Sequence, residues 1–180
     1  GVGGSAAAGA LYAYINKSQT NAWSKGLKTI IVEPTDADCV MENIENKNVQ
    51  KLVPCLGETE SIMSGLNCGV PSTVAYPVLR ELSDLCVAIG DDWARAGMRI
   101  MAREGIVAGE SGAAGIGTLV ALHNYSQSVG LMEVSGFDES SVILCVNTEA
   151  DTDPEGYDCI VKCRGDPANC PECPMRNRCH

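Results

Sequence analysis

The sequence predicts an α/β fold, with an open, layered and largely parallel sheet that carries helices on both faces. Short runs of β-branched residues alternate along the chain with longer segments of helix-forming residues. That alternation is typical of parallel sheets, in which a helix connects each strand to the next. The chain has 180 residues, of which 45% are hydrophobic and 20% are charged. This composition indicates a packed core rather than disorder.

The segments at the N-terminal end follow this alternation. Residues 5–15 are rich in alanine and follow a glycine turn, which favours a helix. Residues 27–33 form a short β-branched run that stops at Pro34, as a buried strand would. A short helix is expected next, at residues 36–43.

Between residues 49 and 85 the pattern is weaker. Residues 49–54 are a weak candidate for a strand. Two helices are expected, at residues 59–66 and 76–85. Gly69 and Pro71 separate them, because glycine and proline both interrupt regular helices.

The C-terminal half returns to a clear alternation of strands and helices. Strands are expected at residues 86–89 and 141–147, which are rich in valine and isoleucine. A helix at residues 91–103 begins with two aspartates, which suit the positive end of the helix dipole. A long apolar helix is expected at residues 111–126. A last helix, at residues 154–161, has a proline in its first turn.

The chain is acidic, with 23 aspartate and glutamate residues against 13 lysine and arginine residues and a net charge of −10. Such a charge disfavours binding to nucleic acid or to an anionic membrane surface. The longest apolar run falls far short of the roughly 20 residues that span a bilayer. No basic residue precedes the first apolar stretch, as one would in a secretory signal, so a cytoplasmic location is expected.

Cysteine content and charge divide the sequence into residues 1–154 and residues 155–180. Five of the ten cysteines lie in the second part, and the whole net negative charge lies in the first. The second part is expected to hold the last helix and a cysteine-rich tail. The cysteines of the first part have apolar neighbours and are expected to be buried thiols. A disulfide between Cys39 and Cys68 is an alternative that one sequence leaves open.

The tail has the spacing of half a zinc site. Cys170 and Cys173 form a Cys-x2-Cys pair, which can place two thiolates on one metal ion. Cys163 and either Cys179 or His180 would complete a tetrahedral set, with zinc preferred over an iron–sulfur cluster. The alternative is a flexible tail whose thiols bind no metal.

Three loops at predicted helix or strand ends carry groups suited to a ligand. Residues 1–5, Gly-Val-Gly-Gly-Ser, open a helix, and the backbone amides of such a loop can hold a phosphate. An ordinary glycine turn is the alternative. Glu110 lies between glycines at a helix start, where it can face a ligand ring or cap its own helix. Thr148 follows a predicted strand and can hydrogen-bond a heteroaromatic nitrogen, whereas Asp151 and Asp153 are expected in a helix cap and a solvated loop.

In their order along the chain, these motifs resemble the C-terminal part of the diaminopropionate ammonia-lyases. That family belongs to the fold-type-II pyridoxal-phosphate enzymes, the tryptophan synthase β group. The resemblance covers about residues 1–162, and its most specific part is the motif at residues 61–71, Ser-Ile-Met-Ser-Gly-Leu-x-Cys-Gly-x-Pro. It implies a partial tryptophan synthase β-like fold. Residues 1–154 would then be the C-terminal portion of a lyase catalytic domain.

The resemblance also implies roles for particular residues. The loop that binds the cofactor phosphate is matched by Gly1, Val2, Gly3, Gly4 and Ser5. Glu110 matches the acid beside the cofactor ring, and Thr148 matches the hydroxyl residue near the pyridine nitrogen. A neutral partner at that nitrogen limits the delocalisation of negative charge into the ring. The implied reaction is an α,β-elimination of 2,3-diaminopropionate that yields pyruvate and ammonia.

The same resemblance places the Schiff-base lysine and the acid–base residues upstream of the matched region. The chain is therefore expected to be a truncated one, with part of a pyridoxal 5'-phosphate site, no catalytic residue of its own and no activity alone. Ala150 stands where the family usually has glycine. The whole enzyme is expected to be a homodimer that acts on a small amino acid.

Two alternatives to this function stay open. One is another fold-type-II β-eliminase or dehydratase, acting on serine or threonine. The other is a non-catalytic metal-binding module that uses the cysteine-rich tail.

Overall fold

The computed structural model describes residues 4–17, 27–46, 51–129 and 136–162. The chain divides into two compact units, Gly1–Gly90 and Asp91–His180, and each is described here by itself. The described residues form helices and a parallel pair of strands, which confirms the predicted α/β class. None of the described helices is both long enough and apolar enough to span a membrane.

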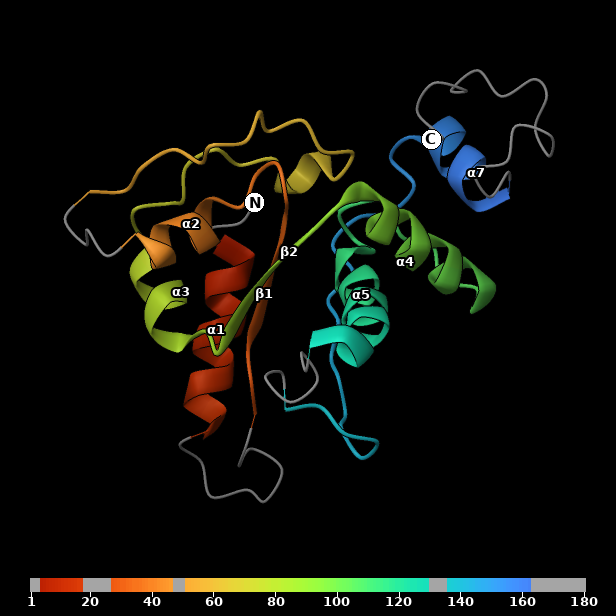
Figure 1. Ribbon diagram of the computed structural model, residues 1–180. Helices are drawn as coiled ribbons and strands as arrows, with labels where there is room; N and C mark the ends of the chain where they lie inside the picture. Colours follow the sequence, from red (N-terminus) through yellow and green to blue (C-terminus); the bar gives the residue numbers. More distant parts are fainter. Residues whose placement is uncertain (1–3, 18–26, 47–50, 130–135, 163–180) are drawn as a thin grey trace. The chain divides into compact units, whose positions relative to one another are not determined.

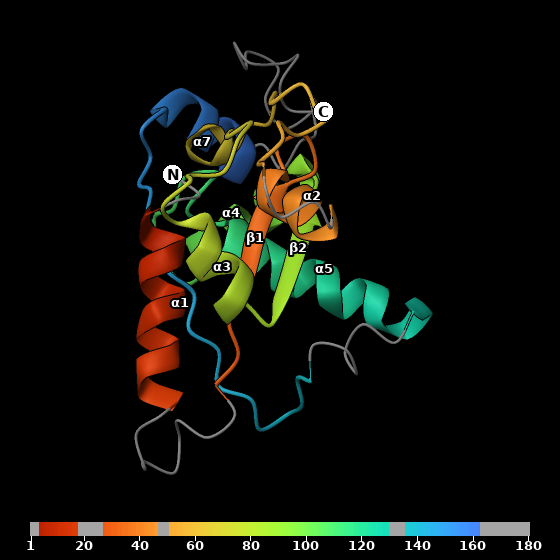
Figure 2. The same cartoon turned by 90° about the vertical axis from the view of Figure 1, so that its left-hand side faces the viewer.

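The first unit is built around two parallel strands, β1 (Ile30–Pro34) and β2 (Leu85–Ile89). They pair in register from Ile30 opposite Leu85 to Pro34 opposite Ile89, and Figure 2 shows them side by side. Both strands were expected from their β-branched residues. Because the strands are parallel, the chain that leaves the end of β1 has to cross back to the opposite end of the sheet before β2 can begin. Two α-helices lie in this crossover.

Three helices accompany these strands (Figure 1). They are α1 (Gly4–Lys17), α2 (Cys39–Glu45) and α3 (Tyr76–Leu82). α1 packs against α3, and α2 contacts both strands. The core they share contains the buried side chains of Ala10, Ile31, Val40, Tyr76 and Leu79. One apolar residue or more from each helix and from β1 therefore holds the unit together.

A buried carboxylate determines where α2 begins. Glu33, at the end of β1, is only 1% exposed, and its two oxygens accept the backbone N–H groups of Val40 and Met41 at 2.9 Å each. These amides lie in the first turn of α2, where no carbonyl of the helix can accept them. The helix consequently begins at Cys39, three residues after the start that the sequence predicts. Burial raises the pKa of Glu33, although both hydrogen bonds oppose the shift.

Two predictions in the segment between α2 and α3 are wrong. Residues 51–54, the described part of the expected strand at 49–54, form no strand, and the expected helix at 59–66 is reduced to a 3-10 turn, η1 (Ser64–Leu66). In each place an asparagine side chain pairs with the backbone. Asn43 bonds both the N–H and the carbonyl of Val53, at 2.9 and 2.8 Å, and Asn67 does the same for Ser61, at 3.2 and 2.7 Å. Such side-chain bonds compete with regular secondary structure.

The second unit contains α4 (Asp91–Arg103), α5 (Ala114–Val129) and α7 (Pro154–Lys162). α4 packs against both α5 and α7. Its contact with α5 is close because both helices present glycine there. A Cβ atom on Gly97 would lie 2.5 Å from the carbonyl oxygen of Ala113, and one on Gly117 would lie 2.3 Å from that of Trp93. The buried side chains of Met98, Met101 and Ile160 contribute to the core of this unit.

The expected strand at residues 141–147 is also a wrong prediction. This segment has no regular secondary structure, and Val142, Leu144 and Val146 are 99%, 86% and 71% exposed. Its apolar composition suits a strand that is buried on both faces. A strand exists only where a neighbour completes its hydrogen bonds, and among the described residues the sheet consists of β1 and β2 alone.

Candidate functional site

Two of the predicted ligand loops meet in the second unit. The turn at residues 109–112 lies against the extended segment at residues 147–150, and backbone and side-chain hydrogen bonds join them. The N–H of Gly109 donates to the carbonyl oxygen of Glu149 at 3.0 Å, and the N–H of Ser111 donates to the Glu149 carboxylate at 2.6 Å. The loops that carry Glu110 and Thr148 therefore form one structural feature, although they lie far apart along the chain.

The glycines of the turn are required by this close approach. A Cβ atom on Gly109 would lie 2.5 Å from the carbonyl oxygen of Ala150, and one on Gly112 would lie 2.2 Å from Oδ1 of Asn147. Real Cβ atoms are not found so near to other atoms, so any side chain at either position would push the two loops apart. The glycines around Glu110 thus serve contact with residues 147–150.

Glu110 is half-buried in this feature. Burial is the main cause that raises the pKa of its carboxyl group. The nearby carboxylates of Glu149 and Asp153 raise this pKa further, while the guanidinium of Arg95 lowers it. Arg95 is itself buried and donates from Nη1 to Asp92 at 2.9 Å. Glu110 is therefore placed to hold a proton more readily than an ordinary glutamate.

Thr148 is exposed, and its two neighbours in sequence hold the segment in place. Asn147 donates from Nδ2 to the carbonyl oxygen of Val107 at 2.9 Å, and Glu149 binds the glycine turn. The expected helix cap is confirmed for Asp153, whose carboxylate accepts the N–H of Gly156 in the first turn of α7 at 3.2 Å. Ala150 stands where the resembled family usually has glycine. Its φ angle is not positive, so alanine fits this position without backbone strain.

The predicted phosphate loop is only partly described. Gly1, Val2 and Gly3 lie outside the described residues, while Gly4 and Ser5 begin α1 in the first unit. No acidic residue occurs in the first turn of α1. A helix start without a carboxylate leaves its exposed amides and its positive dipole end suited to an anion.

The cysteines proposed as metal ligands, Cys163, Cys170, Cys173 and Cys179, lie outside the described residues, as does His180. Zinc binding by the tail therefore stays a prediction. Within the described ranges, no group of three or more histidine, cysteine, aspartate and glutamate side chains could hold a metal ion. The five cysteines of residues 1–154 are free thiols, Cys39 and Cys68 among them. Of the five, only Cys39 is fully buried as expected, whereas the other four are partly exposed, so the prediction of buried thiols is wrong for them. Burial nevertheless raises the pKa of Cys86 to about 11.

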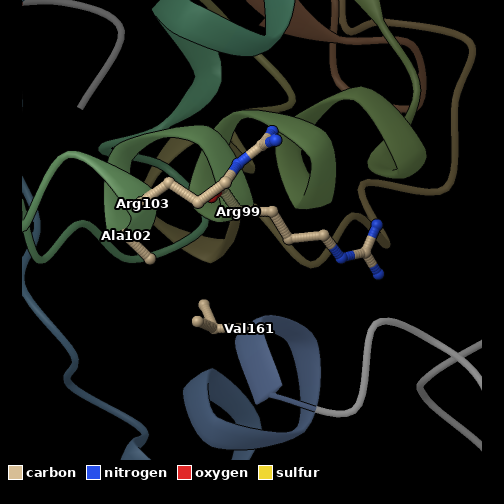
Figure 3. A pocket seen from close by; sticks show the side chains of 4 residues that line it. All are labelled: Arg99, Ala102, Arg103 and Val161. Carbon is tan, nitrogen blue, oxygen red and sulfur yellow. The ribbon is translucent and has the colours of Figure 1, made fainter.

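A cavity of about 300 Å³ in the second unit lies elsewhere, between α4 and α7. Arg99, Ala102, Arg103 and Val161 line it (Figure 3). Arg99 donates from Nε to the carbonyl oxygen of Ile160 at 2.9 Å, and the two guanidinium groups point in different directions in Figure 3. They do not converge as a pair that binds one anion would. None of the residues predicted to bind the cofactor lines this cavity.

The sequence pattern alone missed the contribution of Asn147, Glu149 and Arg95. The only signal was indirect, since Gly109 and Gly112 indicate that some other part of the chain comes close. Which part it is, and that Glu149 rather than Glu110 binds the amide of Ser111, depends on the tertiary arrangement.

Comparisons with known proteins agree with the resemblance that these loops suggested. A family model described as "Pyridoxal-phosphate dependent enzyme" matches residues 1–132. The chain is similar to diaminopropionate ammonia-lyase of Escherichia coli K12, with 35% identity over 138 residues, which cover 74% of this chain and 34% of that protein. The enzyme of the same name from Salmonella typhimurium LT2 is 33% identical over 165 residues, which cover 88% of this chain and 39% of the relative. The chain thus spans about a third of the length of these relatives.

Solved structures give the same picture. The E. coli diaminopropionate ammonia-lyase in complex with D-serine is similar, with a TM-score of 0.64 and 32% identity over 76% of this chain and 34% of that one. Serine racemase of maize has a TM-score of 0.53 and 20% identity over 69% of this chain and 36% of that one. At this lower identity, the second similarity concerns the fold alone.

Proposed function

Because the chain belongs to the family of pyridoxal-phosphate-dependent enzymes, we propose that it is part of an ammonia-lyase that eliminates ammonia from 2,3-diaminopropionate. Pyruvate is the other product. The observation that carries the proposal is the combination of sequence and geometry at residues 109–112 and 147–150. These loops hold the residues that resemble the lyase motifs, and hydrogen bonds of 2.6 and 3.0 Å join them.

The residues present fit a pyridoxal 5'-phosphate site in their chemistry. The phosphate is assigned to the amides of the loop at residues 1–5, which opens the acid-free first turn of α1. When bound, the cofactor supplies an electron sink for the negative charge that develops at the substrate α-carbon. The exposed hydroxyl of Thr148 is assigned to the pyridine nitrogen, where it stays neutral at any ordinary pH. Glu110 is assigned to the ring, where burial and the neighbouring carboxylates raise the pKa of its carboxyl group.

We assign no catalytic residue to this chain. The Schiff-base lysine has to occupy a fixed position relative to the phosphate site. None of the lysines in the sequence lies in the motif context that such a lysine has in the family. One of the described ones, Lys162, pairs with Asp158 at 2.6 Å. The relatives are about three times as long as the matched region, so the proposal places this lysine and the acid–base groups in a part of the enzyme that precedes the matched residues.

Reduction with borohydride tests the assignment of the lysine. We expect the 180-residue chain, mixed with pyridoxal 5'-phosphate, to show no absorbance band of lysine-bound cofactor and no lysine labelled after reduction. A strong band that borohydride fixes onto one of the lysines, such as Lys28 or Lys51, would contradict the proposal.

The coding sequence upstream of Gly1 provides the test of the reaction. If it encodes a lysine-bearing loop in frame, the extended protein should release pyruvate from 2,3-diaminopropionate in preference to serine and threonine. Preference for serine or threonine would instead support a dehydratase of the same fold. We further propose that the whole enzyme is a cytoplasmic homodimer, which size-exclusion chromatography of the extended protein would test.

A further inference from the structure

We infer that Glu149 is a positioning residue of the site, which anchors the turn at residues 109–112 on both sides of Glu110. The inference deepens the proposed function and rests on it, since the role of Glu110 at the cofactor ring is itself proposed. Its structural part depends only on contacts within the second unit.

The anchoring uses the backbone and both carboxylate oxygens of Glu149. Its carbonyl oxygen accepts the N–H of Gly109 at 3.0 Å, and Oε2 accepts the N–H of Ser111 at 2.6 Å. These two amides are the ones immediately before and after Glu110. Oε1 accepts the hydroxyl of Thr152 at 3.3 Å, which holds the carboxylate from the other side. A bond from an amide to an ionised acceptor is about twice as strong as one between neutral groups.

Glu149 is itself fixed by the residues around it. Its N–H donates to Oδ1 of Asn147 at 3.3 Å, and Nδ2 of Asn147 donates to the carbonyl oxygen of Val107 at 2.9 Å. Successive side chains of an extended chain point in opposite directions. With Asn147 and Glu149 directed at residues 107–112, this alternation leaves Thr148 exposed between them. The same segment therefore anchors Glu110 and presents Thr148.

The charge of Glu149 also acts on Glu110. The charged side chains with the largest effect on the pKa of Glu110 are Arg95 from α4 and Glu149 and Asp153 from the segment before α7. The two carboxylates raise the pKa of Glu110 and Arg95 lowers it, so the ionised form of Glu149 helps to keep a proton on Glu110. The titration of Glu110 therefore reports the charge of Glu149, just as exchange at the Ser111 amide reports its hydrogen bond.

The test compares E149Q with D151N in the full 180-residue chain, by NMR with isotope labelling. Both variants remove one negative charge from the same segment, but Asp151 is exposed and is not among the groups that shift Glu110. E149Q should speed hydrogen exchange at the Ser111 amide about tenfold, because the charge-assisted bond becomes a neutral one. It should also move the titration of the Glu110 carboxyl group to lower pH. D151N should change neither.

Protection of the amides of Met98 and Leu122, which are buried in α4 and α5, shows that a variant is folded. An unchanged exchange rate at Ser111 in folded E149Q would overturn the anchoring. Faster exchange with an unchanged Glu110 titration would overturn the positioning role. If both effects occur but added pyridoxal 5'-phosphate shifts no signal of Glu110 or Thr148, the proposed function fails, and the role at the cofactor fails with it, while the anchoring stands.

Discussion

Glu33 combines two opposing effects in one side chain. Its carboxylate accepts the amides of Val40, which is buried, and of Met41, which is partly buried; both would otherwise lack an acceptor. Its own burial disfavours the charged form and raises its pKa. The amides gain an ionic acceptor at the start of α2, and the fold has to desolvate a charge to provide it.

Replacing Glu33 with alanine should lower the free energy of unfolding by roughly 2–4 kcal/mol, because two N–H groups, one buried and one partly buried, lose their acceptor at about 1–3 kcal/mol each. Chemical denaturation at pH 7 measures the change. E58A is the matched control, since Glu58 is exposed and its replacement should have an effect within about 0.5 kcal/mol of zero. Equal effects of the two variants would contradict the capping role of Glu33.

The pH dependence of the same pair tests the direction of the pKa shift. The pKa of Glu33 in the folded chain lies above its ordinary value of 4.5, so the folded state binds this proton more tightly than the unfolded state does. Tighter proton binding stabilises the folded state. The stabilisation is complete below pH 4.5, where Glu33 is protonated in both states, and it is lost as the pH rises through the raised pKa of the folded state. The advantage of the wild type over E33A should therefore grow as the pH falls from about 7 toward the ordinary value. If the stability difference between wild type and E33A shrinks as the pH falls, the raised pKa of Glu33 is contradicted.

At the level of elements, the packing of α4 on α5 depends on two glycines that face backbone atoms of the other helix. Alanine normally stabilises the interior of a helix relative to glycine, by about 0.5–1 kcal/mol. At Gly97 a steric clash opposes that gain, because the new Cβ atom would lie only 2.5 Å from the carbonyl oxygen of Ala113. Because the obstacle is backbone, the helices have to separate to admit the methyl group.

We expect G97A to lower the free energy of unfolding by roughly 1–3 kcal/mol, the usual cost of overpacking. G9A provides the matched control, since it is also a glycine-to-alanine change within a helix, and a Cβ atom at Gly9 would meet nothing within 4 Å. G9A should be neutral or stabilising. Thermal and chemical denaturation of both variants give the comparison, and a stable G97A would show that α4 and α5 do not pack this closely.

The sequence predicted elements well where local pattern and tertiary contacts agree. β2 and α4 match their expected positions closely, because a short β-branched run and a helix with acidic residues in its first turn are local signals. The segment at residues 141–147 has the composition of a strand, but pairing depends on a neighbour that composition does not reveal. Likewise, the pairing of Asn43 with Val53 joins residues ten apart and could not be read from either one.

Over the whole molecule, the chain covers about a third of the relatives that it matches, and its candidate cofactor residues fall in two groups. The motifs allowed the loops of Glu110 and Thr148 to be singled out from the sequence, and the structure joins these loops. The anchoring by Glu149 could not be predicted, since it is a contact between a side chain and an amide 38 residues away. The central proposal is that each group of residues binds pyridoxal 5'-phosphate.

An NMR titration of the 180-residue chain with pyridoxal 5'-phosphate tests this claim most directly, with pyridoxal as the control that lacks the phosphate. The account predicts saturable shifts at the amides of Gly4 and Ser5 in the first unit and at Glu110 and Thr148 in the second. Pyridoxal should bind more weakly and leave the Gly4 and Ser5 amides unshifted, since their ligand is the phosphate. Shifts confined to one group of residues, or absent from both, would contradict it.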